Sequence, residues 1–317
     1  MKTDTVTIGP FKGVNTKLPD ARLRGEDGDW LRSAVNVDIT QAGTIKRRAG
    51  SVRMLTGEDC HSLFSCRRAA FYVDGGTLFR LNPDDTKTQI TTGLIAGLAV
   101  SFQPVRDEVW WSNGVQGGRI TDLDHVNGWG GAYTEAVNNA GYMLAPMPFG
   151  SIVRHYKGRL LTVQGNTLFF SEPYSEHLYR PDRNWIVTAE PITLVVPMDT
   201  GVWVCADKTY WLAGDLADTT LAEILPYGAI PRSDFRHPDE KVAMWSSSQG
   251  IVKAGEGEAS TPMSKAINAM GALAGATVYV EHDGMGKAIA SNLGTNVSGA
   301  AIGSFMDAEV IRKGTVK

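Results

Sequence analysis

The chain has 317 residues, of which 43% are hydrophobic and 9% aromatic, with 35 glycines and a formal net charge of −3. This length is enough for a sizeable core, and the slight acidity argues against a general nucleic-acid-binding surface, which needs a clear basic excess. No run of about 18 apolar residues is present, so no membrane span is expected, and neither is a secretory signal. The three cysteines, Cys60, Cys66 and Cys205, show no CxxC spacing, which predicts reduced thiols that pack as small apolar side chains.

Residues 1–33 are predicted to form an N-terminal arm. Gly9, Pro10, Gly13 and Pro19 interrupt regular structure, and the charged stretch 22–31 is typical of a loop or short helix. The segment that follows, 34–50, reads as a hairpin, because two strands of alternating character flank a Gln-Ala-Gly reversal at 41–43.

One short pattern then recurs six times from about residue 60: a strand, a turn rich in Gly, Asn or Asp, and a second strand. Each copy places β-branched or aromatic residues on both sides of a turn that tolerates positive φ. The turn centres are spaced by about 35 to 51 residues, close to the length of a four-stranded propeller blade. They fall near Gly75, Gly114, Gly165, Asp207, Gln249 and Gly284.

A repeat that cannot bury its own faces must stack on its neighbours, and a ring of such repeats is a β-propeller. The sequence therefore predicts an all-β protein, a β-propeller of about five to six blades spanning 34–317. We expect the ring to be closed by N- and C-terminal strands, with the hairpin 34–50 and a tail strand at about 305–312 sharing one blade, since closure removes exposed sheet edges.

Three segments interrupt the repeats. Residues 127–148, rich in Gly, Asn and Pro, predict a long loop, and shorter excursions are expected at 180–184 and 228–239. One helix is predicted from Thr261 or Pro262 to about Ala272, because Thr261 is a good N-cap and proline suits the first helical turn.

Four stretches in this order resemble the propeller proteins of bacteriophage tails. The first contains Asn36, Asp38, Gly43 and the run Arg47-Arg48-Ala49-Gly50, similar to an N-terminal N-x-D … G … R-x-G signature of that group. The others are residues 155–173, 201–214 and 305–312. The group includes the tail nozzle of short-tailed phages and tail hub proteins. The chain is much shorter than a nozzle protein, so the resemblance implies a nozzle, a neck or a baseplate component.

Candidate binding residues are few. Trp110, Trp111, Trp203 and Trp211 are the aromatic residues that would stack on sugars in a glycan-binding propeller, although packing between blades is the favoured interpretation. A propeller glycosidase needs an acid and a base, for which the sequence offers Asp84-Asp85, Asp107-Glu108 and Asp122 with Asp124. These carboxylates adjoin turn residues, so solvated turns are the favoured interpretation.

Metal and cofactor sites are not expected. The six histidines show no HxxxH or HxH spacing, and no GxSxG, P-loop or dinucleotide-binding motif is present. The basic run 46–48 with Arg53 suits a charged outer strand or a subunit contact. No catalytic residue is assigned.

The expectation that follows is a non-enzymatic virion structural protein, assembled in the host cytoplasm, that forms a ring with other copies of itself, most simply six, and contacts other tail or connector proteins. DNA would pass through such a ring without adhering. A receptor- or glycan-binding propeller at the tail tip and a propeller-fold glycoside hydrolase are the alternatives. The residues assigned to closure or assembly are Asn36, Asp38, Arg47, Arg48, Asp307, Glu309 and Arg312.

Overall fold

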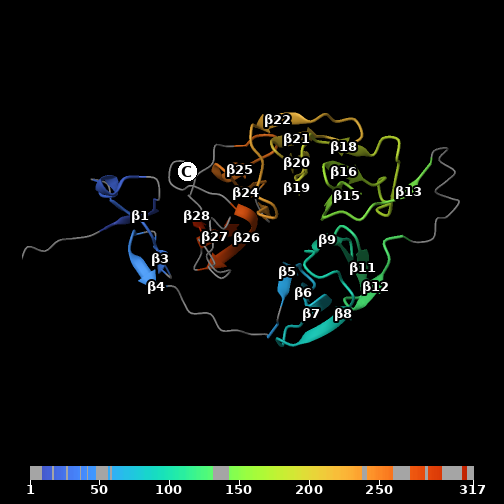
Figure 1. Ribbon diagram of the computed structural model, residues 1–317, viewed down its shortest axis with the longest axis horizontal. Coiled ribbons are helices and arrows are strands. Elements are labelled where there is room, and N and C mark those ends of the chain that lie inside the picture. The colour runs from blue at the N-terminus through green and yellow to red at the C-terminus, as the bar shows by residue number, and fades with distance from the viewer. Residues whose placement is uncertain are drawn as a thin grey trace, which may run out of the picture.

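The computed structural model describes residues 9–15, 18–25, 28–35, 37–40, 42–47, 56–57, 59–130, 143–237, 241–259, 272–282, 285–294 and 309–312. Apart from a 3-10 turn at Asp20–Arg22, the regular structure in these residues is β (Figure 1). No helix within them has the length and apolar character of a membrane span. Most of the loop expected at 127–148 and nearly all of the helix expected at 261–272 lie outside the described residues.

Five antiparallel sheets follow one another along the chain, and we call them blades 1 to 5. In each blade the strands pair in sequence order, which is the connectivity of a propeller blade. Blade 1 contains β5 (Cys60–Ser65), β6 (Ala70–Asp74), β7 (Thr77–Leu81) and β8 (Lys87–Thr91), and blade 2 contains β9 (Ser101–Val105), β10 (Glu108–Ser112), β11 (Gly117–Thr121) and β12 (His125–Asn127). Blade 3 contains β14 (Ile152–Tyr156), β15 (Arg159–Gln164), β16 (Thr167–Phe170) and β18 (Trp185–Val187). Blade 4 contains β19 (Leu194–Pro197), β20 (Gly201–Cys205), β21 (Thr209–Ala213) and β22 (Ala222–Leu225), and blade 5 contains β23 (Phe235–Arg236), β24 (Ala243–Ser247) and β25 (Gly250–Ala254).

The blades are arranged around an arc with their first strands innermost. Figure 1 shows the five sheets in chain order, and β14 contacts both β9 and β19, the first strands of the two neighbouring blades. A small extra sheet of β13 (Ala145–Pro146) and β17 (Leu178–Tyr179) joins the segments on either side of β14–β16. The β-propeller class predicted from the repeats is confirmed.

Five of the six predicted hairpins are present at the predicted turns. The hairpin of β6 and β7 is representative: Asp74 pairs with Thr77, and between them Gly75 and Gly76 have φ values of 56° and 77°. Left-handed backbone at both central residues fits the twist of the strands, which is why glycine marks this turn. The sixth turn, near Gly284, lies outside the described residues, although its two strands are described.

A sixth sheet lies beyond blade 5, on the open side of the arc. It consists of β26 (Ala272–His282), β27 (Met285–Gly294) and β28 (Glu309–Arg312), and it contacts blade 5 through β23 (Figure 1). The tail strand expected at about 305–312 is therefore present as β28, which pairs with β27 through Ala290 and Glu309.

The predicted closure of the ring is not what the described strands show. The hairpin at 34–50 forms, as β3 (Val37–Ile39) and β4 (Ile45–Arg47), but it is a separate two-stranded sheet, whereas the tail strand pairs with β27. The hairpin instead contacts the arm, which contains the parallel pair β1 (Phe11–Val14) and β2 (Asp29–Leu31).

A buried glycine fixes this contact between arm and hairpin. Gly43 has φ 73°, and a Cβ added there would collide with Pro10, while the amide of Phe11 donates a 2.7 Å hydrogen bond to the Gly43 carbonyl. We call residues 9–47 the N-terminal unit, and Figure 1 shows it to one side of the blades.

The core lies between successive blades rather than within any one of them. Separate clusters join blades 1 and 2, blades 2 and 3, blades 3 and 4, and blades 4 and 5. The cluster between blades 4 and 5 contains Trp203 and Trp245, both fully buried, with ring centroids 5.7 Å apart. Each blade thus depends on its neighbours for burial of its apolar faces.

The Trp203→Ala variant should lose about 3–5 kcal/mol of unfolding free energy, because a large fully buried side chain leaves a cavity between two blades. Its indole also donates a 2.9 Å hydrogen bond to the Gly255 carbonyl. Trp185→Ala is the matched control, since that side chain is 46% exposed and should lose less than about 1 kcal/mol. Urea denaturation followed by circular dichroism measures both, and equal losses would contradict this account of the core.

Candidate functional site

The antiparallel strands of each blade place their connections on two opposite faces of the propeller. Turns between first and second strands, and between third and fourth strands, emerge on one face, which we call face A. The remaining turns and the connections between blades emerge on the opposite face, face B. The charged side chains that link neighbouring blades lie on face A and along the innermost strands.

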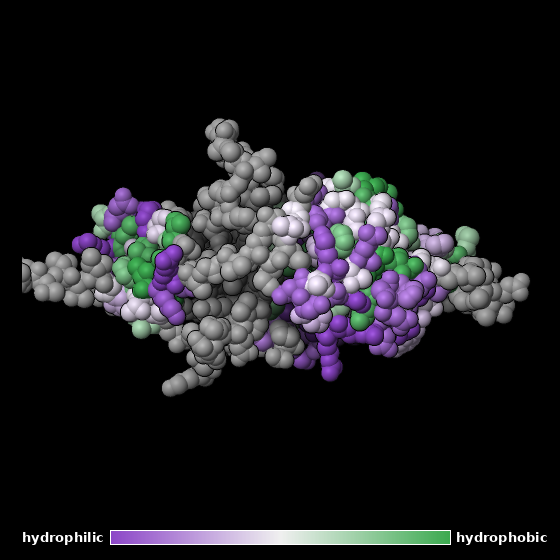
Figure 2. All heavy atoms as spheres, turned by 90° about the horizontal axis from the view of Figure 1, so that it is seen from below, coloured by the Kyte–Doolittle hydropathy of each residue, from purple (hydrophilic) through white to green (hydrophobic). Residues whose placement is uncertain are grey.

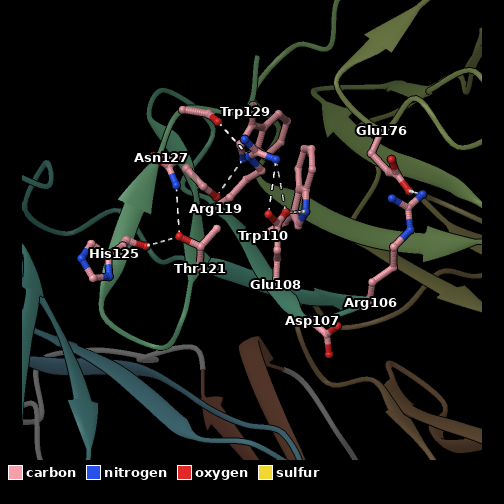
Figure 3. Close-up of polar contacts among 12 residues, drawn as sticks. Arg106, Asp107, Glu108, Trp110, Arg119, Thr121, His125, Asn127, Trp129 and Glu176 are labelled. Carbon is pink, nitrogen blue, oxygen red and sulfur yellow. Dashed lines mark hydrogen bonds and ion pairs between the residues drawn. The ribbon is translucent and has the colours of Figure 1, made fainter. Parts of the chain in front are cut away.

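Ion pairs link each of the first four blades to the next on or near face A. Arg68 of blade 1 pairs with Asp107 of blade 2 at 3.4 Å, and Arg106 of blade 2 pairs with Glu176 of blade 3 at 2.8 Å (Figure 3). The series continues with Arg159 and Asp215 at 3.4 Å, and with Asp199 and Arg236 at 2.7 Å. These pairs span the joints between blades, and each has at least one exposed partner, so their role is mainly to fix orientation.

The Arg106–Glu176 pair is the most buried contact of this series on its acidic side. Only 7% of the Glu176 side chain is exposed, whereas Arg106, in the turn after β9 with φ 53°, remains largely exposed. Two histidines adjoin the pair. Burial lowers the pKa of His155, with Glu176 opposing the shift, and burial also lowers the pKa of His177, where Arg119 adds to the effect.

An arginine on the innermost strand of blade 3 connects four blades. Arg154 donates to the Val195 carbonyl of blade 4 at 3.1 Å and to the Ser101 hydroxyl of blade 2 at 3.2 Å. It also forms a 2.7 Å ion pair with Asp234, the residue before β23 of blade 5, and both side chains are mostly buried. Sequence reasoning missed this cluster because Asp234 is 80 residues away. Its one signal in the sequence is an arginine that directly follows the apolar pair Ile152 and Val153.

The tryptophans named for glycan stacking belong to the core. Trp110 and Trp111 are 3% and 4% exposed, and Trp203 and Trp211 are 0% and 8% exposed. Their ring faces are therefore unavailable to a sugar while the blades stay packed, and the packing role favoured from the sequence is the one observed.

Figure 3 shows how the Trp110 ring is held. Its indole nitrogen donates to Glu108, whose carboxylate also pairs with Arg119 at 3.3 Å, and the Arg119 guanidinium lies 5.5 Å from the ring centroid. The Trp129 ring packs against the Trp110 ring at an angle of 49°, with centroids 5.6 Å apart, and the Trp129 indole donates to the Trp111 carbonyl. The carboxylate of Glu108 thus serves packing within blade 2.

The other candidate carboxylates lie in turns on face A. Asp84 and Asp85 occupy the turn between β7 and β8, and Asp122 and Asp124 the turn between β11 and β12. Two hydrogen bonds from Thr86, the side-chain one the larger, lower the pKa of Asp84. Among the described residues no three His, Cys, Asp or Glu side chains approach closely enough to hold a metal ion.

The described residues among those assigned to closure or assembly lie in two separate sheets. In the N-terminal unit, Asp38 on β3 faces Lys46 and Arg47 on β4 faces Val37. In the sixth sheet, Glu309 is paired in register with Ala290, and Arg312 with Lys287. Asn36, Arg48 and Asp307 lie outside the described residues.

Comparison with known proteins gives structural likeness only. No family model matches the chain, and no curated protein matches its sequence. The chain is similar to the WD40 domain of Neurospora crassa Pan2, with 9% identity, a TM-score of 0.46, and coverage of 73% of this chain and 71% of that one. It is also similar to Kluyveromyces lactis Hsv2 (12% identity, TM-score 0.45, 80% and 85% covered) and to YCF48 from Cyanidioschyzon merolae (9%, 0.43, 71% and 74%).

Replacement of Arg154 by alanine should destabilise the protein by about 2–3 kcal/mol, because Asp234 then stays mostly buried without its partner. Arg154→Lys should recover only part of the loss, since an ammonium cannot reach three blades at once. Arg183→Ala is the control, because its pair with Asp218 is long, at 3.6 Å, and exposed. Thermal unfolding measures the series. An Arg154→Ala melting temperature equal to that of the control would contradict the stabilising role given to Arg154.

Stability should fall as the pH drops from about 7.5 to 5.5. The pKa values of His155 and His177 are lower in the folded state, so the unfolded chain binds protons first as the pH passes below its histidine value of about 6.5. The double variant His155→Gln with His177→Gln should show a smaller difference in urea midpoint between these pH values. An unchanged difference would assign the pH dependence to other groups.

Proposed function

We propose that this protein is a non-enzymatic structural component of a bacteriophage virion that assembles as a ring in the tail or at the head–tail connection. The proposal rests on the order of four stretches that resemble tail propeller proteins. It is supported by a propeller whose buried tryptophans and inner Arg154 are engaged in joining blades to one another. In this role the propeller acts as a rigid plate, and its partners are further copies and other virion proteins.

The N-terminal unit supports the assembly part of the proposal. It has its own strand pairs and capping contacts: Arg32 donates to the Leu18 carbonyl and pairs with Asp20, and the amide of Leu18 donates to the Asn15 side chain. A separate small unit held outside the blades suits attachment to a neighbour, since a surface that projects can reach a second molecule. Ring assemblies need a contact of this heterologous kind.

The β26–β28 sheet is proposed as the sixth blade, with its edge facing blade 1. This arrangement closes the propeller with C-terminal strands alone and leaves the N-terminal unit free for assembly. Closure of this kind protects the sheet edges of the first and last blades.

A passage for DNA would be lined by repelling charge. Acidic residues occupy the turns between third and fourth strands of blades 1 to 4, as Asp85, Asp124, Asp182 and Asp218 illustrate, and Glu258 follows the third strand of blade 5. If the part of face A that other copies leave uncovered lines the path, like-charge repulsion keeps the duplex from adhering.

Cryo-electron microscopy of particles from cells that express the complete set of virion genes tests the proposal. A symmetric ring of this chain on the tail axis is the expected result. The same cells expressing a chain without residues 1–47 should contain folded propeller but no ring density. Density on a peripheral appendage would instead favour receptor binding, and a normal ring from the truncated chain would remove the role given to the N-terminal unit.

A further inference from the structure

The two parts of the chain carry opposite formal charge. Residues 1–50 sum to +3 and residues 51–317 to −6, which together give the net charge of −3. Such asymmetry within one chain favours association between the oppositely charged parts.

The basic surface is the exposed strand β4 of the N-terminal unit. Its residues Ile45, Lys46 and Arg47 are all exposed, Ile45 at 44%, and Arg48 follows in the sequence. Across the hairpin, Asp38 is paired in register with Lys46 and is the acidic residue of this sheet. We call Ile45–Arg47 the basic strand.

The acidic surface is formed by two neighbouring turns on face A. Asp84 and Asp85 lie in the turn of blade 1, and Asp122 and Asp124 in the turn of blade 2; all four are exposed. Arg80 joins the turns, because its guanidinium donates to Asn82 of the first at 3.0 Å and to the Leu123 carbonyl of the second at 3.4 Å. We call these four aspartates the acidic turns.

These carboxylates are less neutralised than those of the next blades. Within the described residues no lysine or arginine pairs with any of the four, and Asp124 pairs only with the exposed His125. Lys87, the nearest lysine in sequence, extends over the Phe79 ring to Asp74. In blades 3 and 4, by contrast, the corresponding turns hold arginine partners, as in the pairs Arg180–Asp182, Arg159–Asp215 and Arg183–Asp218.

The two surfaces lie on different sides of the molecule. Figure 1 places β3 and β4 at one end of the long axis, while β8 and β12, which follow the acidic turns, lie across the propeller. Figure 2, seen from the side of β8 and β12, shows the hydrophilic surface of the blades there and the N-terminal unit well separated from it. Complementary surfaces at separate places on one molecule pair between copies and generate a ring or a filament.

We propose that the basic strand of one copy docks on the acidic turns of blades 1 and 2 of a second copy, so that the chain associates head to tail. This inference deepens the proposed ring and rests on it for the number of copies. Charge complementarity directs the encounter and fixes which surfaces meet, and Ile45 adds apolar contact within the charged patch.

Charge reversal in the full-length chain tests the contact. Lys46→Glu with Arg47→Glu, and separately Asp85→Lys with Asp124→Lys, should each weaken self-association by about tenfold or more, measured by sedimentation velocity at low salt. The chain that carries all four changes should recover association, because the two surfaces are again complementary. Raising the salt concentration should weaken the original contact.

Matched controls change the same charge elsewhere. Lys12→Glu with Arg24→Glu alters exposed residues of the N-terminal unit outside the basic strand, and Glu190→Lys with Asp207→Lys alters exposed residues of face B. Both should associate as the original chain does. Asp85→Asn with Asp122→Asn provides a milder variant, because asparagine tolerates the φ values of 63° and 49° at these positions.

A zero-length carbodiimide cross-linker identifies the surfaces directly. In a mixture of isotope-labelled and unlabelled chains, Lys46 should form cross-links between copies to the acidic turns. Self-association that changes neither with the salt concentration nor with any of the charge-reversal substitutions would overturn the docking while leaving the proposed ring in place. A chain that stays monomeric at every concentration would overturn the docking as well, and absence of ring density in particles would remove the proposed function separately.

Discussion

Every part of the propeller depends on burial of apolar side chains between one blade and the next. A four-stranded blade has two apolar faces and no means of covering either, so its stability comes from neighbours on both sides. The clusters that contain Trp111, Leu160, Leu212 and Trp245 occupy successive joints, and each draws residues from two blades. Burial of the apolar faces of one repeat therefore requires the repeats on either side of it.

Polar contacts add direction to this stacking. Apolar burial does not specify the angle between blades, whereas Arg154 has geometric requirements that several blades satisfy together. The ion pairs on face A act similarly at the outer ends of the joints.

The N-terminal unit differs from the blades in its charge and in its strand pairing. Its charge is opposite to that of the blades, and its strands pair among themselves rather than with the tail strand. The N-terminal unit lies to one side of the blades, so a contact made through it need not change the packing between blades. Docking of the basic strand on the acidic turns would join an exposed basic surface of the N-terminal unit to an exposed acidic surface of the blades.

The repeated strand–turn–strand pattern determined the propeller class. Alternation of side chains and left-handed turns are local properties, and glycines such as Gly75 and Gly76 mark these turns in the sequence. The sequence also indicated the hairpin of β3 and β4, the tail strand, and the packing role of the tryptophans. Only the tertiary structure decided which strands share a sheet, since the hairpin and the tail strand are both short and alternate equally well. Likewise, Arg154 meets Asp234 across 80 residues of chain. Pairing over such distances depends on how blades stack in space, and no local pattern of residues encodes it.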